Sequence, residues 1–346
     1  MLLIYSRYQS NFELSYIKNI LLKKISIKKE IILEDIKNKN DKIFNNNHLI
    51  FVYSPGDKKV LNSVENFVKN RELTYSLIHL SDEMLNDDIG LYNNAQLIVR
   101  NYFNPFIFRK NIYTVPLGFQ SGFYLNRNFS EPEFRRNYIW SFAGQIYKNR
   151  KNMIKELESL GNYFIHQTIG FNSKNGIDAM ELREIYLDSI FAPCPFGYIN
   201  ADTFRVMEVL ESGCIPIVKK YFKLDYYKII FGDHPFLIVN EWNEATKYIE
   251  DFIDNPKELL KKQKEVHEWY KAFKKNLYKD VENLLYGNFK NLNSIQFKYQ
   301  KKISIKIKTY LKFFFIFRIK NKNSYIIISK TIYKIKQKLK NLLIRK

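Results

Sequence analysis

Cysteine, glycine and proline are scarce in this chain, and no run of about 18 apolar residues occurs in it. Two cysteines in 346 residues exclude a disulfide scaffold, while 12 glycines and 9 prolines exclude collagen-like and low-complexity chains. Because no apolar run is long enough, we expect no transmembrane helix. The residues after Met1 lack a basic stretch before an apolar one, so we expect no signal peptide, a cytoplasmic protein, and reduced thiols at Cys194 and Cys214.

Apolar and charged residues are both plentiful. Hydrophobic residues make up 46% of the chain and charged ones 26%, which excludes disorder throughout and suffices for about two domains. The net charge of +21 is uneven, because residues 283–346 hold 15 Lys, 2 Arg and no acidic residue, and the rest carries only +4. Abundant Ile, Lys, Asn, Tyr and Phe are typical of an AT-rich, bacterial-looking sequence, so codon bias is one source of the lysine excess.

In residues 298–346, lysines are interleaved with bulky apolar side chains. This pattern favours contact with an anionic membrane surface, where each basic residue adds about 1 kcal/mol. The protein would then be peripheral on the inner face of the membrane. A codon-biased extension without a role is the second interpretation. Nucleic-acid binding is the third, since the body of the chain is almost balanced in charge.

Short apolar runs alternate with helix-like periodicity along the chain, which predicts two α/β domains with parallel sheets facing a cleft. We expect a first domain over residues 1–125, a polar linker near 124–136, a second domain over 137–285 and a basic extension over 286–346. The strands expected in the first domain are 2–4, 48–53, 75–80, 96–99 and 112–115, with a helix over 60–70. Those expected in the second are 138–142, 162–166, 189–192, 215–218 and 236–239, with helices over 150–160, 179–187, 203–212, 243–252 and 256–285.

The segment that is most informative about function is residues 189–219, which has the pattern strand, loop, helix, glycine turn, strand. Its loop, ending at Gly197, leaves the carboxyl end of a strand, where open α/β sheets bind ligands. Asp202 is a good N-cap for a helix that begins at Thr203, and a helix N-terminus suits a phosphate. Arg205 could donate hydrogen bonds to two phosphate oxygens, and Glu208 could accept hydrogen bonds from both hydroxyls of a ribose. By spacing alone, a solvated ion pair worth about 0.2–0.5 kcal/mol is favoured for these two residues.

This segment resembles the exostosin family of glycosyltransferases, in which a loop precedes an Asp/Ser-x-x-Arg-x-x-Glu helix and then Gly-Cys-Ile-Pro. Asp202, Arg205, Glu208, Gly213, Cys214, Ile215 and Pro216 match in register. Other pieces follow in the expected order and are similar to the xylosyltransferase branch. They are His79-Leu-Ser-Asp-Glu83, Val99-Arg-Asn-Tyr102, Val115-Pro-Leu-Gly-Phe119, Trp140-Ser-Phe-Ala-Gly144 with Arg150, and Asn162-Tyr-Phe-Ile-His166. The resemblance covers residues 75–255.

The resemblance implies a GT-B fold of two Rossmann-like domains and a nucleotide-sugar donor, most simply a UDP-sugar, without a further cofactor. Gly144 and Gln145 would lie near the diphosphate, and Arg150 and Arg205 would neutralise it as it leaves. Further donor-site residues would be Gly197, Asp202, Thr203 and Glu208, the last one holding the ribose. The sequence has no cluster of His and Asp and no Asp-x-Asp triplet, so we expect no metal site.

The resemblance also implies an inverting transfer with the first domain on the acceptor side, and such a transfer needs a base for the acceptor hydroxyl. Asp82 and Glu83 follow an expected strand of the first domain and are the candidates, with Asp57 behind them. Ser81-Asp-Glu could equally cap the next helix. His166 ends a strand and could line the donor site, although a single histidine is more often structural.

The sequence therefore predicts a glycosyltransferase that moves a sugar from a nucleotide donor to a glycan or lipid-linked glycan acceptor of a surface polysaccharide. A non-catalytic nucleotide- or glycan-binding scaffold protein is the alternative, and a basic nucleic-acid protein is a third, disfavoured one. Only the enzyme needs a carboxylate in the cleft.

Overall fold

The computed structural model describes residues 1–7, 13–37, 42–53, 58–69, 72–85, 87–107, 109, 111–124, 136–170, 175–197, 200–221, 224–288, 304, 307 and 309. Asp57 lies outside these residues, as does nearly all of the basic extension that is expected to contact a membrane. Within the described part, no helix is both long enough and apolar enough to cross a membrane. Cys194 and Cys214 are both buried free thiols.

The first half of the chain folds around a six-stranded sheet in which every neighbouring pair is parallel. Its spatial order is β2-β1-β3-β4-β5-β6. The strands are β1 (Leu2–Tyr5), β2 (Lys29–Ile32), β3 (Leu49–Tyr53), β4 (Tyr75–His79), β5 (Ile98–Arg100) and β6 (Ile112–Thr114). All residues of β3 and β4 are buried, which explains the unbroken apolar run of β3, whereas β4 also buries the polar residues Ser76 and His79.

Helices in this first domain are fewer than the sequence pattern suggests. Among the described residues only α3 (Lys58–Val68) is a full-length helix, and its apolar positions pack on the sheet. In the described part of the connection from β4 to β5, the one helical element is the 3₁₀ turn η4 (Gly90–Asn93), although the connection is long enough for a helix. The remaining helical pieces are short: α1 (Leu14–Tyr16), the π-helical η2 (Ile17–Leu21), the 3₁₀ turn η3 (Leu33–Asp35) and α2 (Lys42–Asn45).

The second domain is built on a five-stranded parallel sheet in the order β11-β10-β9-β7-β8. Its strands are β7 (Tyr138–Gln145), β8 (Tyr163–Thr168), β9 (Ser189–Cys194), β10 (Ile215–Lys219) and β11 (Leu237–Val239). Its helices are α4 (Lys148–Leu157), the 3₁₀ turn η5 (Glu158–Leu160), α5 (Ala179–Leu187), α6 (Phe204–Glu211), α7 (Tyr227–Phe231) and α8 (Trp242–Asp254). The strand order reverses between β7 and β9, and such a switch point is where open α/β sheets bind ligands.

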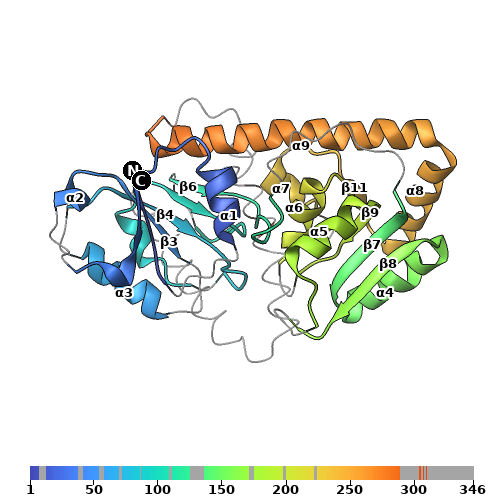
Figure 1. Ribbon diagram of the computed structural model, residues 1–346, viewed down its shortest axis with the longest axis horizontal. Helices are drawn as coiled ribbons and strands as arrows, with labels where there is room; N and C mark the ends of the chain where they lie inside the picture. The colour runs from blue at the N-terminus through green and yellow to red at the C-terminus, as the bar shows by residue number, and fades with distance from the viewer. Residues whose placement is uncertain are drawn as a thin grey trace.

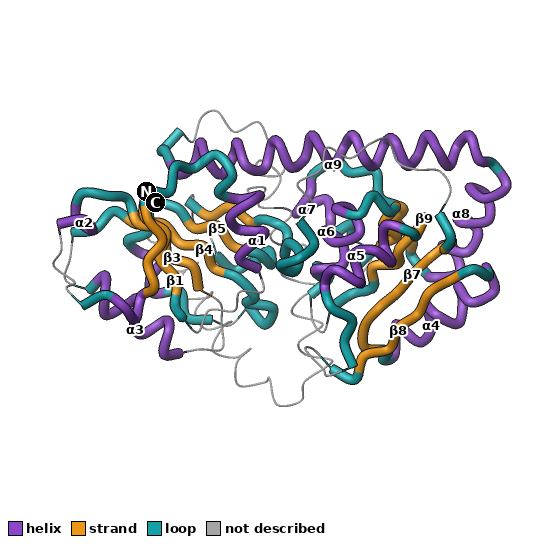
Figure 2. Tube along the Cα trace, in the orientation of Figure 1, coloured by secondary structure: helices purple, strands orange, loops and turns teal. Residues whose placement is uncertain are grey.

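The long helix α9 (Pro256–Leu285) connects the two domains (Figures 1 and 2). It begins with the Asn255 side chain bonding the amide of Glu258, beside α8 of the second domain. Its last turns lie against the first domain, where the Tyr113 hydroxyl donates to Asp280 at 3.4 Å and η2 packs on the helix. The sequence pattern located this helix in the second domain, but its carboxyl end helps to hold the first.

Candidate functional site

A cavity of about 680 Å³ lies between the two domains, at the carboxyl ends of their parallel strands. The first domain lines it from the segments after β4, β5 and β6, and the second from the ends of β7, β8 and β9 and the start of α6. The sequence-predicted residues on its wall are Glu83, Gly144, Gln145, Arg150, Gly197, Asp202, Thr203, Arg205 and Glu208. The cavity is therefore an interdomain site at the switch point of the second sheet.

Two buried guanidinium groups, those of Arg150 and Arg205, face this cavity. Arg150 donates to the carbonyl oxygens of Gln145 and Phe196, both at 2.9 Å, and Arg205 donates to the carbonyl of Ala143. Among the described residues neither guanidinium has a carboxylate within 4.0 Å, although both are shielded from water. Burial and the neighbouring Arg205 charge lower the pKa of Arg150 to about 10, so both groups stay positive at neutral pH. This part of the cavity has the charge and the hydrogen-bond donors that suit an anion.

Aromatic rings and a glycine hold the two guanidiniums in place. The guanidinium carbon of Arg205 lies 4.5 Å from the ring centre of Phe142, and that of Arg150 lies 4.5 Å from Tyr147. Gly144 has φ +148°, and a Cβ there would lie 2.7 Å from Arg205 Nη2 and 3.6 Å from Arg150 Nη1. A glycine at the end of β7 therefore leaves open the space between the two cations.

The amino end of α6 opens into the same cavity. Thr203, and not Asp202 as the sequence predicted, is the N-cap residue, and its side chain makes no capping bond. The Asp202 side chain instead accepts a hydrogen bond from the amide of Leu117 in the first domain, at 2.8 Å. Burial raises the pKa of Asp202 to about 7, against the lowering effect of the amides of Leu117 and Thr203. Asp202 Oδ1 and Thr203 Oγ1 are buried without a partner among the described residues, so both are open to a ligand.

Glu208 follows Arg205 by one turn of α6 and is buried on the cavity wall. The two residues are thus not a solvated surface pair. Glu208 Oε1 lies 3.4 Å from the amide nitrogen of Gln120, which donates to it. Burial raises the pKa of Glu208 to about 7, while the charge of Arg205 and the hydrogen bond from the Gln120 amide oppose this rise.

The first-domain wall contains Glu83 and Tyr102, which follow β4 and β5. Glu83 Oε1 accepts a hydrogen bond from the amide of Asn200 in the second domain at 3.1 Å. Ser81 and Tyr102 have φ of +60° and +57°, a left-handed conformation that costs non-glycine residues about 1–3 kcal/mol. The Ser81 amide donates to Asn101 Oδ1 at 2.7 Å and so ties the two strand ends together. Strained backbone at this point is typical of a functional wall.

Asp82 lies outside the cavity wall. Its carboxylate pairs with Arg100 at 2.8 Å, and both side chains are almost fully buried. Asp82 also belongs to the one described trio that could hold a metal ion, with His79 and Asp87. His79 already bonds Asp87 at 2.8 Å and the hydroxyl of Tyr92 at 2.5 Å. Asp82 therefore acts in a buried polar network behind the wall, and we do not retain it as a base.

His166 also lies away from the cavity wall. Its Nε2 is 2.5 Å from the carbonyl oxygen of Asn175, next to β8. This is the structural role that a single histidine more often has.

The cavity includes residues to which the sequence assigned no role. Tyr102, Leu117, Gln120, Tyr147, Thr168, Ile177 and Asp178 are among them. Tyr147 donates to the carbonyl of Gly197 at 3.1 Å and so holds the loop after β9. The available signal was position, because Tyr102, Gln120 and Tyr147 all follow the carboxyl ends of expected strands.

Comparison with known proteins supports the resemblance in the second domain. Residues 122–290 match the sequence model of the RXYLT1 C-terminal domain, a span that excludes the similar segments before residue 122. The human protein ribitol-5-phosphate xylosyltransferase 1 is 24% identical over 227 residues, covering 56% of this chain and 49% of that protein. The chain thus spans about half the length of the curated relative that it matches.

A solved structure of a glycosyltransferase shares the fold, and that of a second one is less similar. The DNA-modifying enzyme β-glucosyltransferase, crystallised with and without uridine diphosphoglucose, superposes with a TM-score of 0.50 at 14% identity, over 82% of this chain and 99% of that one. An α1,3-fucosyltransferase gives a TM-score of 0.49 at 14% identity, over 86% and 91% of the two chains. The chain has the two-domain GT-B fold of glycosyltransferases, and its second domain is similar to the RXYLT1 C-terminal domain.

Proposed function

We propose that this protein is a glycosyltransferase that transfers a sugar from a nucleoside diphosphate sugar, a UDP-sugar, to a hydroxyl of a glycan acceptor. The observation that carries the proposal is the pair of buried guanidiniums, Arg150 and Arg205, which converge on Gly144 without a carboxylate partner in the described chain. The similarity of residues 122–290 to a xylosyltransferase domain supports the same chemistry.

The donor would lie with its diphosphate between the two guanidiniums and the amino end of α6. The Thr203 hydroxyl, which has no partner in the described part of the chain, and the amides of the first helical turn would add hydrogen bonds to it. The Glu208 carboxylate, one turn further along α6, would accept hydrogen bonds from the hydroxyls of the ribose.

The charge of the leaving diphosphate would be neutralised by the protein itself. When the bond between the sugar C1 and the phosphate oxygen breaks, its electron pair goes to that oxygen. Arg150, Arg205 and the helix dipole of α6 would stabilise this negative charge, so we propose that turnover needs no metal ion.

Glu83 would be the base. It lines the cavity from the first domain, whereas the arginines come from the second, so an acceptor could enter between them. As the acceptor oxygen attacks C1 from the face opposite the diphosphate, its proton would pass to the Glu83 carboxylate. One attack of this kind inverts the configuration at C1.

Nucleotide binding tests the donor site. Thermal unfolding would be measured with UDP, GDP, CMP and dTDP and their sugars for the full chain, Arg150→Met and Arg205→Met. A ligand at 100 times its dissociation constant adds about 2.7 kcal/mol to stability. We expect stabilisation by UDP compounds that is lost in both variants and kept in Arg7→Met, which removes an exposed guanidinium elsewhere. No stabilisation of the full chain by any nucleotide would contradict the proposal.

A non-catalytic scaffold protein would also bind nucleotide. Release of UDP from UDP-sugars, in the presence of a panel of glycan acceptors with and without EDTA, separates the two functions. Turnover that survives EDTA supports the proposed enzyme, whereas tight UDP binding without turnover on any acceptor supports the scaffold.

A further inference from the structure

Tyr102 lines the cavity from the first domain, just after the end of β5. Its side chain is buried, and its hydroxyl makes no hydrogen bond to the described part of the chain. The hydroxyl is also not one of the unpartnered polar atoms that are sealed from solvent. It is therefore open to the cavity, where it can both donate a hydrogen bond to a ligand and accept one.

The backbone of Tyr102 is held in an unfavourable conformation. Its φ of +57° lies in the left-handed region, where a residue with a bulky side chain is a clear outlier. Nε of Arg100 donates to the carbonyl oxygens of Asn101 and Tyr102, at 3.3 and 3.2 Å. The amide of Phe103 donates to the Tyr226 hydroxyl of the second domain at 3.1 Å. Bonds on both sides of Tyr102 thus hold a conformation that such a residue rarely adopts, which is typical of functional positions.

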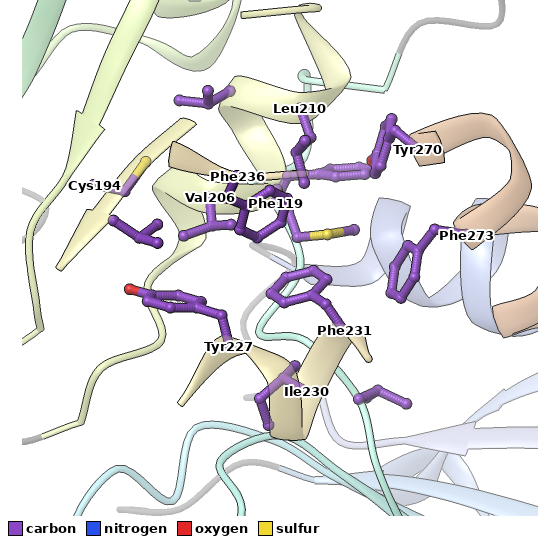
Figure 3. Packing of buried hydrophobic residues seen from close by; sticks show 14 of the residues in the cluster. Phe119, Cys194, Val206, Leu210, Tyr227, Ile230, Phe231, Phe236, Tyr270 and Phe273 are labelled. Atoms are coloured by element: carbon purple, nitrogen blue, oxygen red, sulfur yellow. The ribbon is translucent and has the colours of Figure 1, made fainter. Parts of the chain in front are cut away.

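Tyr226 is a rigid support for this turn. It immediately precedes α7, and its side chain is fully buried. Tyr227 and Phe231 of α7 belong to the buried hydrophobic core (Figure 3), and the Tyr227 hydroxyl donates to the carbonyl of Ala201 at 2.8 Å. The conformation of Tyr102 is therefore supported by a contact between the two domains.

Glu83 reaches the cavity from the neighbouring strand end. Asn101 joins the two segments, since its Oδ1 accepts from the amide of Ser81 at 2.7 Å and its Nδ2 donates to Glu13 at 3.4 Å. The Ser81 hydroxyl donates to the same Glu13 carboxylate at 3.3 Å. Tyr102 and Glu83 are therefore held on one wall of the cavity by a shared network of buried hydrogen bonds.

We propose that Tyr102 is a specificity-determining residue whose hydroxyl bonds a second hydroxyl group of the acceptor glycan, in addition to the one that attacks the donor. This inference rests on the proposed function and extends it to the acceptor side. The proposed donor contacts all come from the second domain, whereas Tyr102 shares its wall with Glu83, the proposed base. An acceptor whose reacting hydroxyl reaches Glu83 therefore presents its other hydroxyls to the same wall.

The Tyr102 hydroxyl remains a hydrogen-bond donor at neutral pH. Burial raises the pKa of Tyr102 well above its usual value, and the charges of Glu83 and Asp202 add to this rise. A site that is built to bond a hydroxyl group rejects a ligand without it, because the partner in the site then loses its bond. Tyr102 thus selects acceptors that carry a hydroxyl at one defined position besides the reacting one.

The experiment measures release of UDP from the UDP-sugar that the chain binds, with methyl glycosides of glucose, galactose and xylose and their monodeoxy analogues as acceptors. The full chain is compared with Tyr102→Phe, which removes only the hydroxyl, and with Tyr248→Phe, the same change at an exposed position of α8. We expect kcat/KM for the best acceptor to fall about tenfold in Tyr102→Phe and to stay unchanged in Tyr248→Phe. The monodeoxy acceptor that lacks the bonded hydroxyl should lose as much in the full chain and nothing further in Tyr102→Phe.

A merely structural role of Tyr102 would lower kcat/KM equally for the intact and the monodeoxy acceptors, and this result would overturn the inference. Unchanged kcat/KM in Tyr102→Phe would overturn it as well. Affinity for the UDP-sugar, and its slow hydrolysis without an acceptor, should change by less than about twofold. A loss of about tenfold in either would mean that the hydroxyl bonds the transferred sugar and not the acceptor, which also contradicts the inference.

Tyr102→Phe should unfold at the same urea concentration as the full chain, because the hydroxyl has no partner in the described part of it. A clear loss of stability would show that the hydroxyl is already bonded inside the protein, and the inference would be wrong. A full chain that binds UDP-sugars but transfers to none of the acceptors is a different result. It contradicts the proposed function itself, on which the inference rests.

Discussion

Asp82 and Arg100 form an ion pair of 2.8 Å in which both side chains are almost completely buried. The pair joins the segment after β4 to the end of β5, directly behind the strained backbone that presents Glu83 to the cavity. Two acidic neighbours in the sequence thus have different surroundings. Asp82 is paired with Arg100 inside the first domain, whereas Glu83 accepts a hydrogen bond from Asn200 of the second domain.

Asp82→Asn should therefore act on stability. Removing one charge of a buried pair leaves the other uncompensated and costs about 3–5 kcal/mol. Urea unfolding of Asp82→Asn, Arg100→Met and the double variant measures this cost, and the double variant should lose less than the sum of the two. A variant of normal stability that had lost sugar transfer would show that Asp82 acts in the reaction.

Glu83→Gln should act on turnover. Loss of a general base slows transfer by about 100-fold or more, whereas the nucleotide contacts in the second domain remain. We expect UDP affinity within about a factor of two of the unmodified chain, because the amide keeps the size and an oxygen acceptor for the amide of Asn200. The control is Glu72→Gln, an exposed acid of the first domain. Unchanged turnover in Glu83→Gln would exclude Glu83 as the base.

Gly144→Ala should weaken nucleotide binding. The added methyl group would lie 2.7 Å from Arg205 Nη2 and displace a guanidinium from the proposed diphosphate site. Loss of one charged hydrogen bond corresponds to about a tenfold weaker affinity for UDP. Gly161→Ala is the matched control, since φ is +66° there but nothing lies within 4 Å of its Cβ. It should lower stability by about 1–3 kcal/mol, because its backbone conformation is one that only glycine adopts readily, and leave affinity unchanged. Equal affinity losses in both variants would refute this explanation.

Glu13 should make stability depend on pH. Burial raises its pKa to about 8, although Ser81 and Asn101 donate hydrogen bonds to the carboxylate. The folded state then holds a proton that the unfolded state releases above its ordinary pKa of about 4.5, so this group's contribution to stability falls as pH rises from about 5 to 8. Glu13→Gln mimics the protonated form and should match the unmodified chain at pH 5.

At pH 9, Glu13→Gln should be more stable than the unmodified chain by about 5 kcal/mol. Urea unfolding at the two pH values measures the difference. Glu250→Gln, on the exposed side of α8, should show no such pH dependence. A Glu13→Gln variant that is equally stable or less stable at pH 9 would mean that folding does not raise the pKa of Glu13.

Much of the secondary structure could be predicted from local patterns. The helix expected over 179–187 matches α5, and the strands flanking α6 lie within two residues of their expected ends. Alternation of apolar strands and amphipathic helices is a local signal, because each element must bury its own apolar face. The short helix α7 was missed, since its five mostly buried residues have no amphipathic period. The sequence also did not show that the described part of the connection from β4 to β5 lacks a full-length helix. A polar segment of helical length does not reveal whether it folds into a helix.

The sequence by itself determined two α/β domains, the candidate anion-binding residues at the ends of β7 and at α6, and a set of candidate carboxylates. Only the tertiary structure decided which of those carboxylates faces the cavity, because the left-handed turn at Ser81 sends Asp82 inward to Arg100 and Glu83 toward the second domain. It also decided that Gln120 contacts Glu208 across 88 positions of sequence. The physical reason is that the cavity walls come from segments distant in the chain, whose side chains meet only when both parallel sheets point their carboxyl ends at one space.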